Sequence, residues 1–209
     1  MALLESTQIG LRQEIGSRET GSVDGGLLTA EDLERMHGDG LRGELIRGVF
    51  HEKMSTGLLH GVIAFRIGAS LLDHAKRSQP GIVAGTDVGV LLELGPDTVR
   101  EPDVAFVPAH RVPAGGITQR FTTVVPDVVA EVASPSDGPG ELAEKARMWL
   151  SLGVRLVWVV QPETRTVDVH RTGQPAVVLG ENAVLSAPDV LPGFEYPLSS
   201  LFSDQADGL

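Results

Sequence analysis

The sequence contains no cysteine among its 209 residues. Disulfide bonds, thiolate zinc sites and cysteine nucleophiles are therefore excluded, and the absence of cysteine fits the reducing cytoplasm, where we expect the protein to reside. No stretch approaches the roughly 20 apolar residues of a membrane-spanning helix, so we expect no membrane partner. Aromatic residues make up only 4% of the chain, which leaves valine, leucine, isoleucine and alanine to fill the hydrophobic core.

Positive charge is also scarce. The 17 lysine and arginine residues are outnumbered by 28 acidic residues, which gives a net charge of −11. A protein that binds nucleic acid without regard to its sequence usually carries a basic surface. The charge balance therefore argues against binding of that kind, although a local basic cleft or a bound cation would offset it.

The composition indicates one globular domain. Hydrophobic residues make up 42% of the chain, which is ordinary for a globular protein, and the length suits one domain. Residues 1–26 are polar and end in a segment rich in glycine and serine, so we predict a flexible leader; they lack the features of a signal peptide. Residues 203–209 are predicted to be a C-terminal tail, which leaves a domain over residues 27–202.

The first half of this domain shows helical and hairpin patterns. Thr29, followed three residues later by an acid, predicts a capped helix that ends by Gly38. Residues 44–54 contain a central Arg-Gly pair that indicates a β-hairpin. Apolar residues then recur at helical spacing over 58–76, which predicts an amphipathic helix.

The second half adds the strands of a sheet. Residues 81–94 and 99–108 are predicted to form two neighbouring strands, and residues 126–134 a central strand buried on both faces. A helix over 141–152 and a strand over 154–160 complete a strand–helix–strand crossover. The patterns predict an α/β fold in which a mixed β-sheet is flanked by helices, with an N-terminal β-hairpin and a C-terminal β-meander.

Two acidic residues interrupt apolar strand patterns. Glu131 lies inside the central strand, and Asp103 opens the apolar run that follows Pro102. A carboxylate is costly to bury unless it is paired, protonated or bound to a metal. Two acids on adjacent strands can converge on one cation, and carboxylate oxygens suit Mg²⁺ or Mn²⁺. Lys145, one of only three lysines, lies on the returning helix, and a lysine amine can act as a base, which arginine cannot.

These residues belong to a longer series of motifs, which resembles the Uma2 family of restriction endonucleases with the PD-(D/E)XK fold. The resemblance runs from about residue 28 to residue 202. The motifs that carry it are Glu44-Leu-Ile-Arg-Gly48, His60, Pro102-Asp103-Val104, Pro126-Asp-Val-Val-Ala-Glu131-Val-Ala-Ser-Pro-Ser-Asp137, Lys145, Trp149, Gly153-Val154 and Val157-Trp-Val-Val-Gln-Pro162.

The resemblance implies a restriction-endonuclease-like active site. Asp103 and Glu131 match the two metal-binding acids, and Mg²⁺ or Mn²⁺ is the implied cofactor. The superfamily's usual lysine would stand at Ala133, and in the family this function moves to the helix position held here by Lys145. Glu44 matches an acid of the first hairpin that can point at the same cleft. The implied reaction is metal-assisted hydrolysis of phosphodiester bonds in nucleic acid, with DNA favoured as the substrate.

The sequence departs from the family at two positions. Trp149 replaces the usual tyrosine, and Gln161 replaces the usual acid before Pro162. Neither change affects the implied metal ligands. His60 matches a family helix position to which the resemblance assigns no role, and a packed or capping histidine is the simpler interpretation.

Several residues have a structural interpretation beside the functional one. Glu131 can instead pair with Arg147 or Arg155, and Lys145 with Glu141 one helical turn before it. Glu44 can simply flank the hairpin turn. Other acids fit turns or solvent-facing strand positions, with Asp87 also a possible outer partner of the site, and both tryptophans fit the core: Asp87, Asp127, Asp137, Trp149 and Trp158.

Three functions follow from these alternatives, and the least supported is a hydrolase that uses the pair of carboxylates on a substrate other than nucleic acid, because aromatic residues that could bind a sugar are few. The first is a metal-dependent endonuclease, which we expect to act as a homodimer because nucleases that cut duplex DNA often pair two sites. The second is a non-catalytic module that keeps the nuclease fold and assembles with itself or with a partner, which the net charge of −11 favours.

Overall fold

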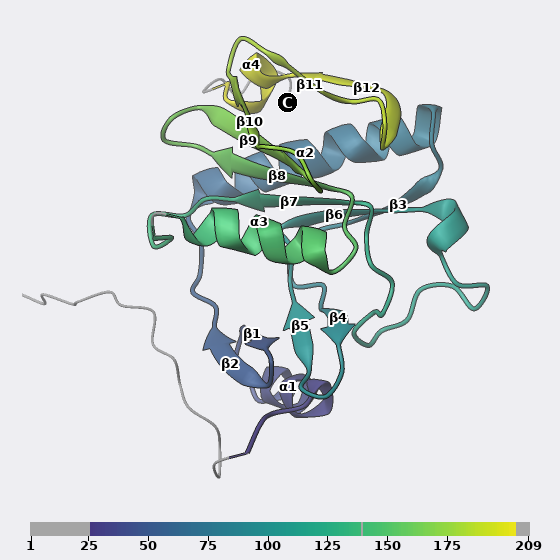
Figure 1. Ribbon diagram of the computed structural model, residues 1–209, viewed down its shortest axis with the longest axis vertical. Helices are drawn as coiled ribbons and strands as arrows, with labels where there is room; N and C mark the ends of the chain where they lie inside the picture. The colour runs from purple at the N-terminus through teal and green to yellow at the C-terminus, as the bar shows by residue number, and fades with distance from the viewer. Residues whose placement is uncertain (1–25, 139, 204–209) are drawn as a thin grey trace, which may run out of the picture.

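The computed structural model describes residues 26–138 and 140–203. The predicted leader and tail lie almost wholly outside these residues, so the predicted domain boundaries stay predictions. Within the described residues, a small sheet with one helix lies at one end of the molecule, and a larger sheet with two long helices lies above it (Figure 1). The candidate site residues lie where these two sheets meet.

The small sheet is built around the predicted N-terminal hairpin. Its strand order is β2-β1-β5-β4, and helix α1 packs beneath it. Thr29 caps α1 through the predicted capping box with Asp32. Arg47 and Gly48 form the hairpin turn with positive φ angles of 51° and 78°, the geometry that two-residue hairpin turns require. The elements are α1 (Ala30–Gly38), β1 (Gly43–Ile46), β2 (Val49–Glu52), β4 (Val90–Glu93) and β5 (Thr98–Arg100).

The large sheet contains the predicted crossover. Its strand order is β10-β9-β8-β7-β6-β3, and only β7 and β8 run parallel to each other. All five residues of β7 are buried, as expected for a central strand covered on both faces. Its elements are β3 (Gly81–Ala84), β6 (Val104–Pro108), β7 (Val128–Val132), α3 (Glu141–Ser151), β8 (Leu156–Gln161), β9 (Thr166–Arg171) and β10 (Val177–Gly180).

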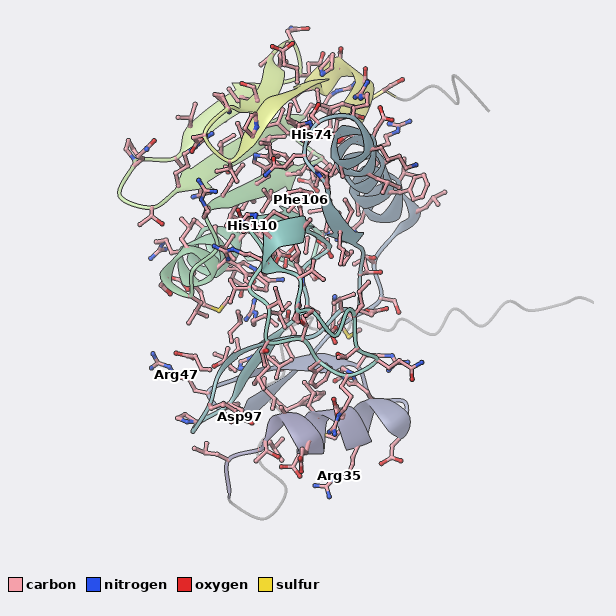
Figure 2. The ribbon with its side chains drawn as sticks, turned by 90° about the vertical axis from the view of Figure 1, so that its right-hand side faces the viewer. Arg35, Arg47, His74, Asp97, Phe106 and His110 are labelled. Atoms are coloured by element: carbon pink, nitrogen blue, oxygen red, sulfur yellow. The ribbon has the colours of Figure 1, made fainter. Side chains whose placement is uncertain are left out.

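Helices cover both faces of the large sheet. Helix α2 (Leu58–Arg77) lies on one face and α3 on the other, as Figure 2 shows edge-on. Side chains of β7 alternate between the two layers: Val128, Ala130 and Val132 pack on the side of α2, and Val129 packs on the side of α3. The predicted mixed sheet flanked by helices is therefore confirmed. None of the helices in the described ranges has the length and apolarity needed to cross a membrane.

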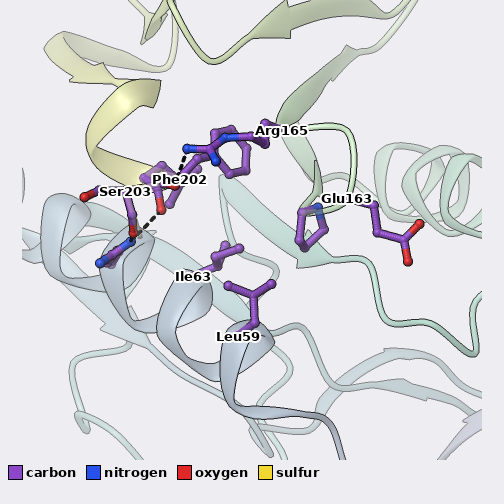
Figure 3. A pocket seen from close by; sticks show the side chains of 9 residues that line it. Leu59, Ile63, Glu163, Arg165, Phe202 and Ser203 are labelled. Atoms are coloured by element: carbon purple, nitrogen blue, oxygen red, sulfur yellow. Dashed lines mark hydrogen bonds between the residues drawn. The ribbon is translucent and has the colours of Figure 1, made fainter. Parts of the chain in front are cut away.

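The C-terminal residues close over one edge of α2. Strands β11 (Val184–Ala187) and β12 (Leu191–Pro197) form their own two-stranded sheet, followed by the short helix α4 (Leu198–Leu201). The Arg66 guanidinium of α2 donates hydrogen bonds to the carbonyls of Leu201 and Ser203 (Figure 3). Helix α2 is thereby attached along one side to the end of the domain.

The two long strands predicted at 81–94 and 99–108 are not continuous. Each divides into two shorter strands, so that β3 and β6 join the large sheet while β4 and β5 join the small one. Asp87, predicted in mid-strand, lies in a turn with a φ of 64° and is 68% exposed at its side chain. At the second break, residues 101–103 include Pro102, which has no amide hydrogen to donate to a strand ladder.

Asp127, which was predicted to be a turn residue, forms ion pairs with two arginines. Its carboxylate is buried and lies 3.0 Å from Arg111 Nε and 3.1 Å from Arg155 Nη1. These ion pairs join the start of β7 to the segments before it and after α3. Asp137, by contrast, accepts a hydrogen bond from the Ser134 amide within the loop after β7, as expected for a turn residue.

Gly153 ends α3 with a φ of 102°, a conformation that residues with a β-carbon rarely adopt. We expect Gly153→Ala to lower the free energy of unfolding by roughly 1–3 kcal/mol. The cause is backbone strain and not a steric clash, because the atom nearest to an added β-carbon is 3.8 Å away. Gly38→Ala, a helical position in open space, serves as the control and is expected to change stability by less than about 1 kcal/mol. Chemical denaturation of both variants measures the difference, and equal stabilities would contradict the assignment.

Candidate metal and catalytic site

Asp103 and Glu131 lie across from each other at the same end of two paired strands. Strands β6 and β7 are antiparallel, with Val104 opposite Ala130, so the next pair along this register is Asp103 and Glu131. Beside burial, the nearby charge of Asp103 raises the pKa of Glu131, so the two carboxylates lie close together. Both side chains are buried, with exposed fractions of 5% and 1%. The structure therefore brings together the two acids that the sequence singled out.

Two side chains of α3 hold the Glu131 carboxylate. Lys145 Nζ donates to Oε2 over 2.8 Å, and Trp149 Nε1 donates to Oε1 over 2.7 Å. The two donors are four residues apart and so share one face of the helix. The alternative partners for Glu131 are wrong, because Arg147 lies beside Glu144 and Arg155 beside Asp127.

The Asp103 carboxylate is held from the other side of the sheet. His60, near the start of α2, places Nε2 3.1 Å from Asp103 Oδ2, and the amide of Val132 donates to the same oxygen over 2.8 Å. No described residue donates a hydrogen bond to Oδ1. His60 is buried, as predicted for a packed histidine, and its contact with Asp103 was not predicted.

Glu44 of β1 joins the same cluster from the small sheet. Its Oε1 accepts a hydrogen bond from the Glu101 amide over 2.6 Å and lies 3.9 Å from Lys145 Nζ, and its Oε2 lies 3.2 Å from Arg100 Nε. Lys145 therefore lies between Glu131 and Glu44. The alternative pairing of Lys145 with Glu141 is wrong, because the Glu141 carboxylate accepts from the Gly138 amide instead.

The sequence patterns did not identify four neighbours of this cluster. Glu101 is buried, and its carboxylate lies 3.7 Å from Lys53 Nζ and 3.8 Å from His37 Nε2. The fourth neighbour, Arg100, is buried beside Glu44. Three charged residues stand close together in the run Arg100-Glu101-Pro102-Asp103, a density unusual for a strand, and this is the one sequence feature that marks the place.

Burial and neighbouring charges shift the pKa values of these groups in different directions. Burial raises the pKa of Glu131, and the nearby Lys145 only partly offsets this. Burial also opposes ionisation of Asp103, but the contact with His60, the hydrogen bond from the Val132 amide and the charge of Lys145 together outweigh it, so the pKa of Asp103 lies below its ordinary value. Burial likewise opposes the charge of Lys145, yet the carboxylates of Glu131 and Glu44 outweigh it and raise the pKa of Lys145. The lysine is accordingly an ammonium ion at neutral pH.

The donor set fits a hard divalent cation that keeps part of its hydration. Mg²⁺ is commonly bound by one or two carboxylates together with water and substrate phosphate oxygens, and Asp103 and Glu131 supply two neighbouring carboxylates. Among residues 26–138 and 140–203, no group of three or more histidine, aspartate or glutamate side chains has the arrangement of a complete metal site. The site therefore suits a cation that is completed by water and substrate.

The raised pKa of Glu131 leads to a prediction about stability. A carboxyl group whose pKa is higher in the folded protein favours folding at low pH, and this contribution is lost as the pH rises through the folded value. Relative to Glu131→Gln, the native protein should therefore lose stability as the pH rises above the ordinary value of 4.5. Urea denaturation of both proteins across this range, in the absence of divalent ions, measures the difference. A difference independent of pH would mean that Glu131 titrates normally.

Comparison with known proteins identifies the relatives of this chain. The family model Uma2, described as "Putative restriction endonuclease", matches residues 30–199. A crystal structure of "a putative nuclease belonging to DUF820" from Anabaena variabilis superposes with a TM-score of 0.73 at 18% sequence identity, covering 84% of this chain and 97% of that one. It shares the fold. No curated protein matches the chain. Because the family model covers most of its length, the chain belongs to the Uma2 restriction-endonuclease-like family.

Proposed function

We propose that this protein is a divalent-metal-dependent endonuclease that hydrolyses phosphodiester bonds in nucleic acid, with DNA as the favoured substrate. One observation carries the proposal. Two buried carboxylates, Asp103 and Glu131, lie close together at the same end of two paired strands, and the ammonium group of Lys145 lies 2.8 Å from Glu131. Membership of a nuclease family supports the same chemistry.

The hydrogen bonds select the oxygens that would hold the cation. His60 and the Val132 amide occupy Oδ2 of Asp103, and Trp149 occupies Oε1 of Glu131. Asp103 Oδ1 and Glu131 Oε2 are therefore the proposed metal ligands, and Lys145 would move away from Oε2. A bound Mg²⁺ or Mn²⁺ activates water and stabilises negative charge on a phosphoryl group.

Lys145 is proposed to act through its charge. A lysine amine is ordinarily protonated at neutral pH, so its ammonium group is suited to stabilise the negative charge of a phosphate in the transition state. Glu44, 3.9 Å from Nζ, keeps the ammonium group on the side of the small sheet. Abstraction of a proton from water by Lys145 is less consistent with this environment, because a base must first lose its own proton.

Local charge also weakens the objection from the net charge of −11. Lys53, Arg100 and Lys145 all lie within 4 Å of a buried carboxylate of the cluster. If a divalent cation neutralises Asp103 and Glu131, Lys145 becomes available to a phosphate. The cluster would then present positive charge locally on a protein that is acidic as a whole.

Removal of either proposed ligand should abolish both metal uptake and cleavage. We expect Asp103→Asn and Glu131→Gln each to lower the cleavage rate by at least about 100-fold, because each removes a charged ligand. Glu144→Gln is the matched control: it lies on α3 beside Lys145, but its carboxylate is 74% exposed and lies near Arg147. Calorimetry with Mn²⁺ and cleavage of plasmid DNA are the measurements. A native protein that takes up no Mn²⁺ and leaves DNA and RNA intact would favour the non-catalytic module instead.

Trp149 is proposed to orient Glu131. Trp149→Phe keeps most of the buried volume but removes the indole donor, so Glu131 Oε1 loses its hydrogen bond. Loss of a hydrogen bond to a metal ligand typically weakens metal affinity or activity by about 10- to 100-fold, and we expect a loss in that range. Trp158→Phe is the control, because Trp158 is equally buried but contacts Phe194 in the core and not the site. Equal Mn²⁺ affinities for the two variants would show that the donor has no such role.

A further inference from the structure

Lys53 carries a buried ammonium group whose hydrogen-bonding capacity is unused. The residue follows β2, and its Nζ is shielded from solvent but donates no hydrogen bond to any part of the chain that the structure describes. The acids that flank it lie beyond hydrogen-bond distance, Glu101 at 3.7 Å and Asp87 at 4.0 Å. Lys145, by contrast, donates to Glu131 over 2.8 Å. An ammonium group has three donors, and a buried donor without an acceptor is costly. The position of Lys53 therefore indicates a missing acceptor.

The chain uses lysine sparingly, and two of its three lysines lie at this cluster. Lysine occurs at positions 53, 76 and 145 among 17 basic residues. Burial raises the pKa of Glu44, but Lys145 and, more weakly, Lys53 are among the charges that lower it below its ordinary value. Both ammonium groups therefore act on the same carboxylate. Lysine binds phosphate as a compact point charge. Because phosphates repeat at every nucleotide of a strand, two lysines around one carboxylate suit two neighbouring phosphates.

Asp87 marks the side from which a phosphate can approach Lys53. The side chain of Asp87 is 68% exposed, whereas that of Glu101 is 1% exposed. Asp87 has a φ of 64°, a conformation that few residues other than glycine adopt, and strained backbone of this kind collects at functional sites. A carboxylate has the same sign of charge as a phosphodiester and the same kind of acceptor oxygen. The exposed Asp87 carboxylate therefore occupies a position beside Lys53 that a phosphate can take over.

We propose that Lys53 binds a phosphate of the nucleic-acid substrate, next to the one held at Asp103 and Glu131. Asp87 occupies that position while no nucleic acid is bound and moves aside when the strand enters. The inference rests on the proposed nucleic-acid substrate, to which it adds a second phosphate-binding position. The alternative is that Lys53 serves only to compensate the buried Glu101 carboxylate. The two interpretations differ in the effect that removal of Glu101 has on a Lys53 variant.

The salt dependence of DNA binding tests the contact. Affinity for a short DNA duplex is measured over a series of salt concentrations in the presence of Ca²⁺, which carboxylates also bind. Loss of one phosphate contact lowers the slope of log affinity against log salt concentration by about 0.9. We expect Lys53→Met to weaken binding and to lower the slope by this amount. Lys76→Met is the control, because Lys76 is exposed in the last turn of α2, at the opposite end of this helix from His60, and it should leave the slope unchanged.

A double variant separates phosphate binding from compensation of Glu101. Lys53→Met leaves the Glu101 carboxylate buried without its closest positive charge, so a loss of stability can contribute to its effect. Glu101→Gln removes the carboxylate. We expect the double variant Lys53→Met, Glu101→Gln to keep the reduced salt slope. Return of the native slope in the double variant would show that Lys53 only compensates Glu101, and would overturn the proposal.

Asp87→Asn should have the opposite effect. It removes the carboxylate that competes with phosphate for Lys53, and asparagine tolerates the same backbone conformation. We expect it to raise the affinity for DNA by roughly two- to fivefold, the range of an exposed ion pair. Asp73→Asn is the control for the loss of one negative charge, because Asp73 is 63% exposed and lies near the end of α2. Equal affinities for the two variants, or a loss of affinity in Asp87→Asn, would contradict the competition.

Binding and cleavage together distinguish this inference from the proposed activity. A native protein that binds DNA through Lys53 but leaves it intact with Mg²⁺ or Mn²⁺ would support the phosphate contact and contradict the nuclease activity. A native protein that cleaves DNA while Lys53→Met keeps the native salt slope would support the activity and overturn the contact. A native protein that does not bind DNA would overturn both.

Discussion

The structure depends on the cost of burying the Glu131 carboxylate in its central strand. Burial in β7 removes nearly all water from this group, and an ionised carboxylate in such a place must be compensated. Lys145 and Trp149 supply this compensation from one face of α3, which fixes the rotation of that helix against the sheet. Further ion pairs continue from this group, because Lys145 also lies close to Glu44, and Glu44 in turn pairs with Arg100. One polar network thereby joins the two sheets.

This network also explains why the two candidate metal-binding acids differ. Asp103 receives a hydrogen bond from a backbone amide and the contact of His60, and its pKa is lowered, whereas the fuller burial of Glu131 raises its pKa. In each acid, one oxygen is not bound by these donors: Oδ1 of Asp103, and Oε2 of Glu131, which is not the acceptor for Trp149. If a divalent cation binds between these two oxygens, it takes over the role that the Lys145 ammonium has toward Glu131. Binding of metal and release of the lysine toward substrate would then be a single event.

Much of the fold was predictable because local patterns carry it. The hairpin turn at Arg47-Gly48, the capped helix at Thr29 and the buried crossover strands follow from short-range rules, and the structure confirms them. The division of two predicted strands between the sheets was not predictable, since pairing partners are distant in sequence. In the site, Glu131 was marked by its apolar surroundings. Lys145 was marked only weakly by the scarcity of lysine, and its assignment depended mainly on the family resemblance, because local spacing favoured a pair with Glu141. The hydrogen bond of Trp149 had no sequence signal, since a buried tryptophan usually serves as core.

The central claim is that Asp103 and Glu131 share one divalent cation. The most direct measurement is a crystal structure of the native protein soaked in Mn²⁺, with the ion located by its anomalous scattering. The account predicts one ion within about 2.0–2.5 Å of Asp103 Oδ1 and Glu131 Oε2, with Lys145 Nζ moved away from Glu131. An ion bound elsewhere, or no ion while the Lys145–Glu131 hydrogen bond stays intact, would contradict it.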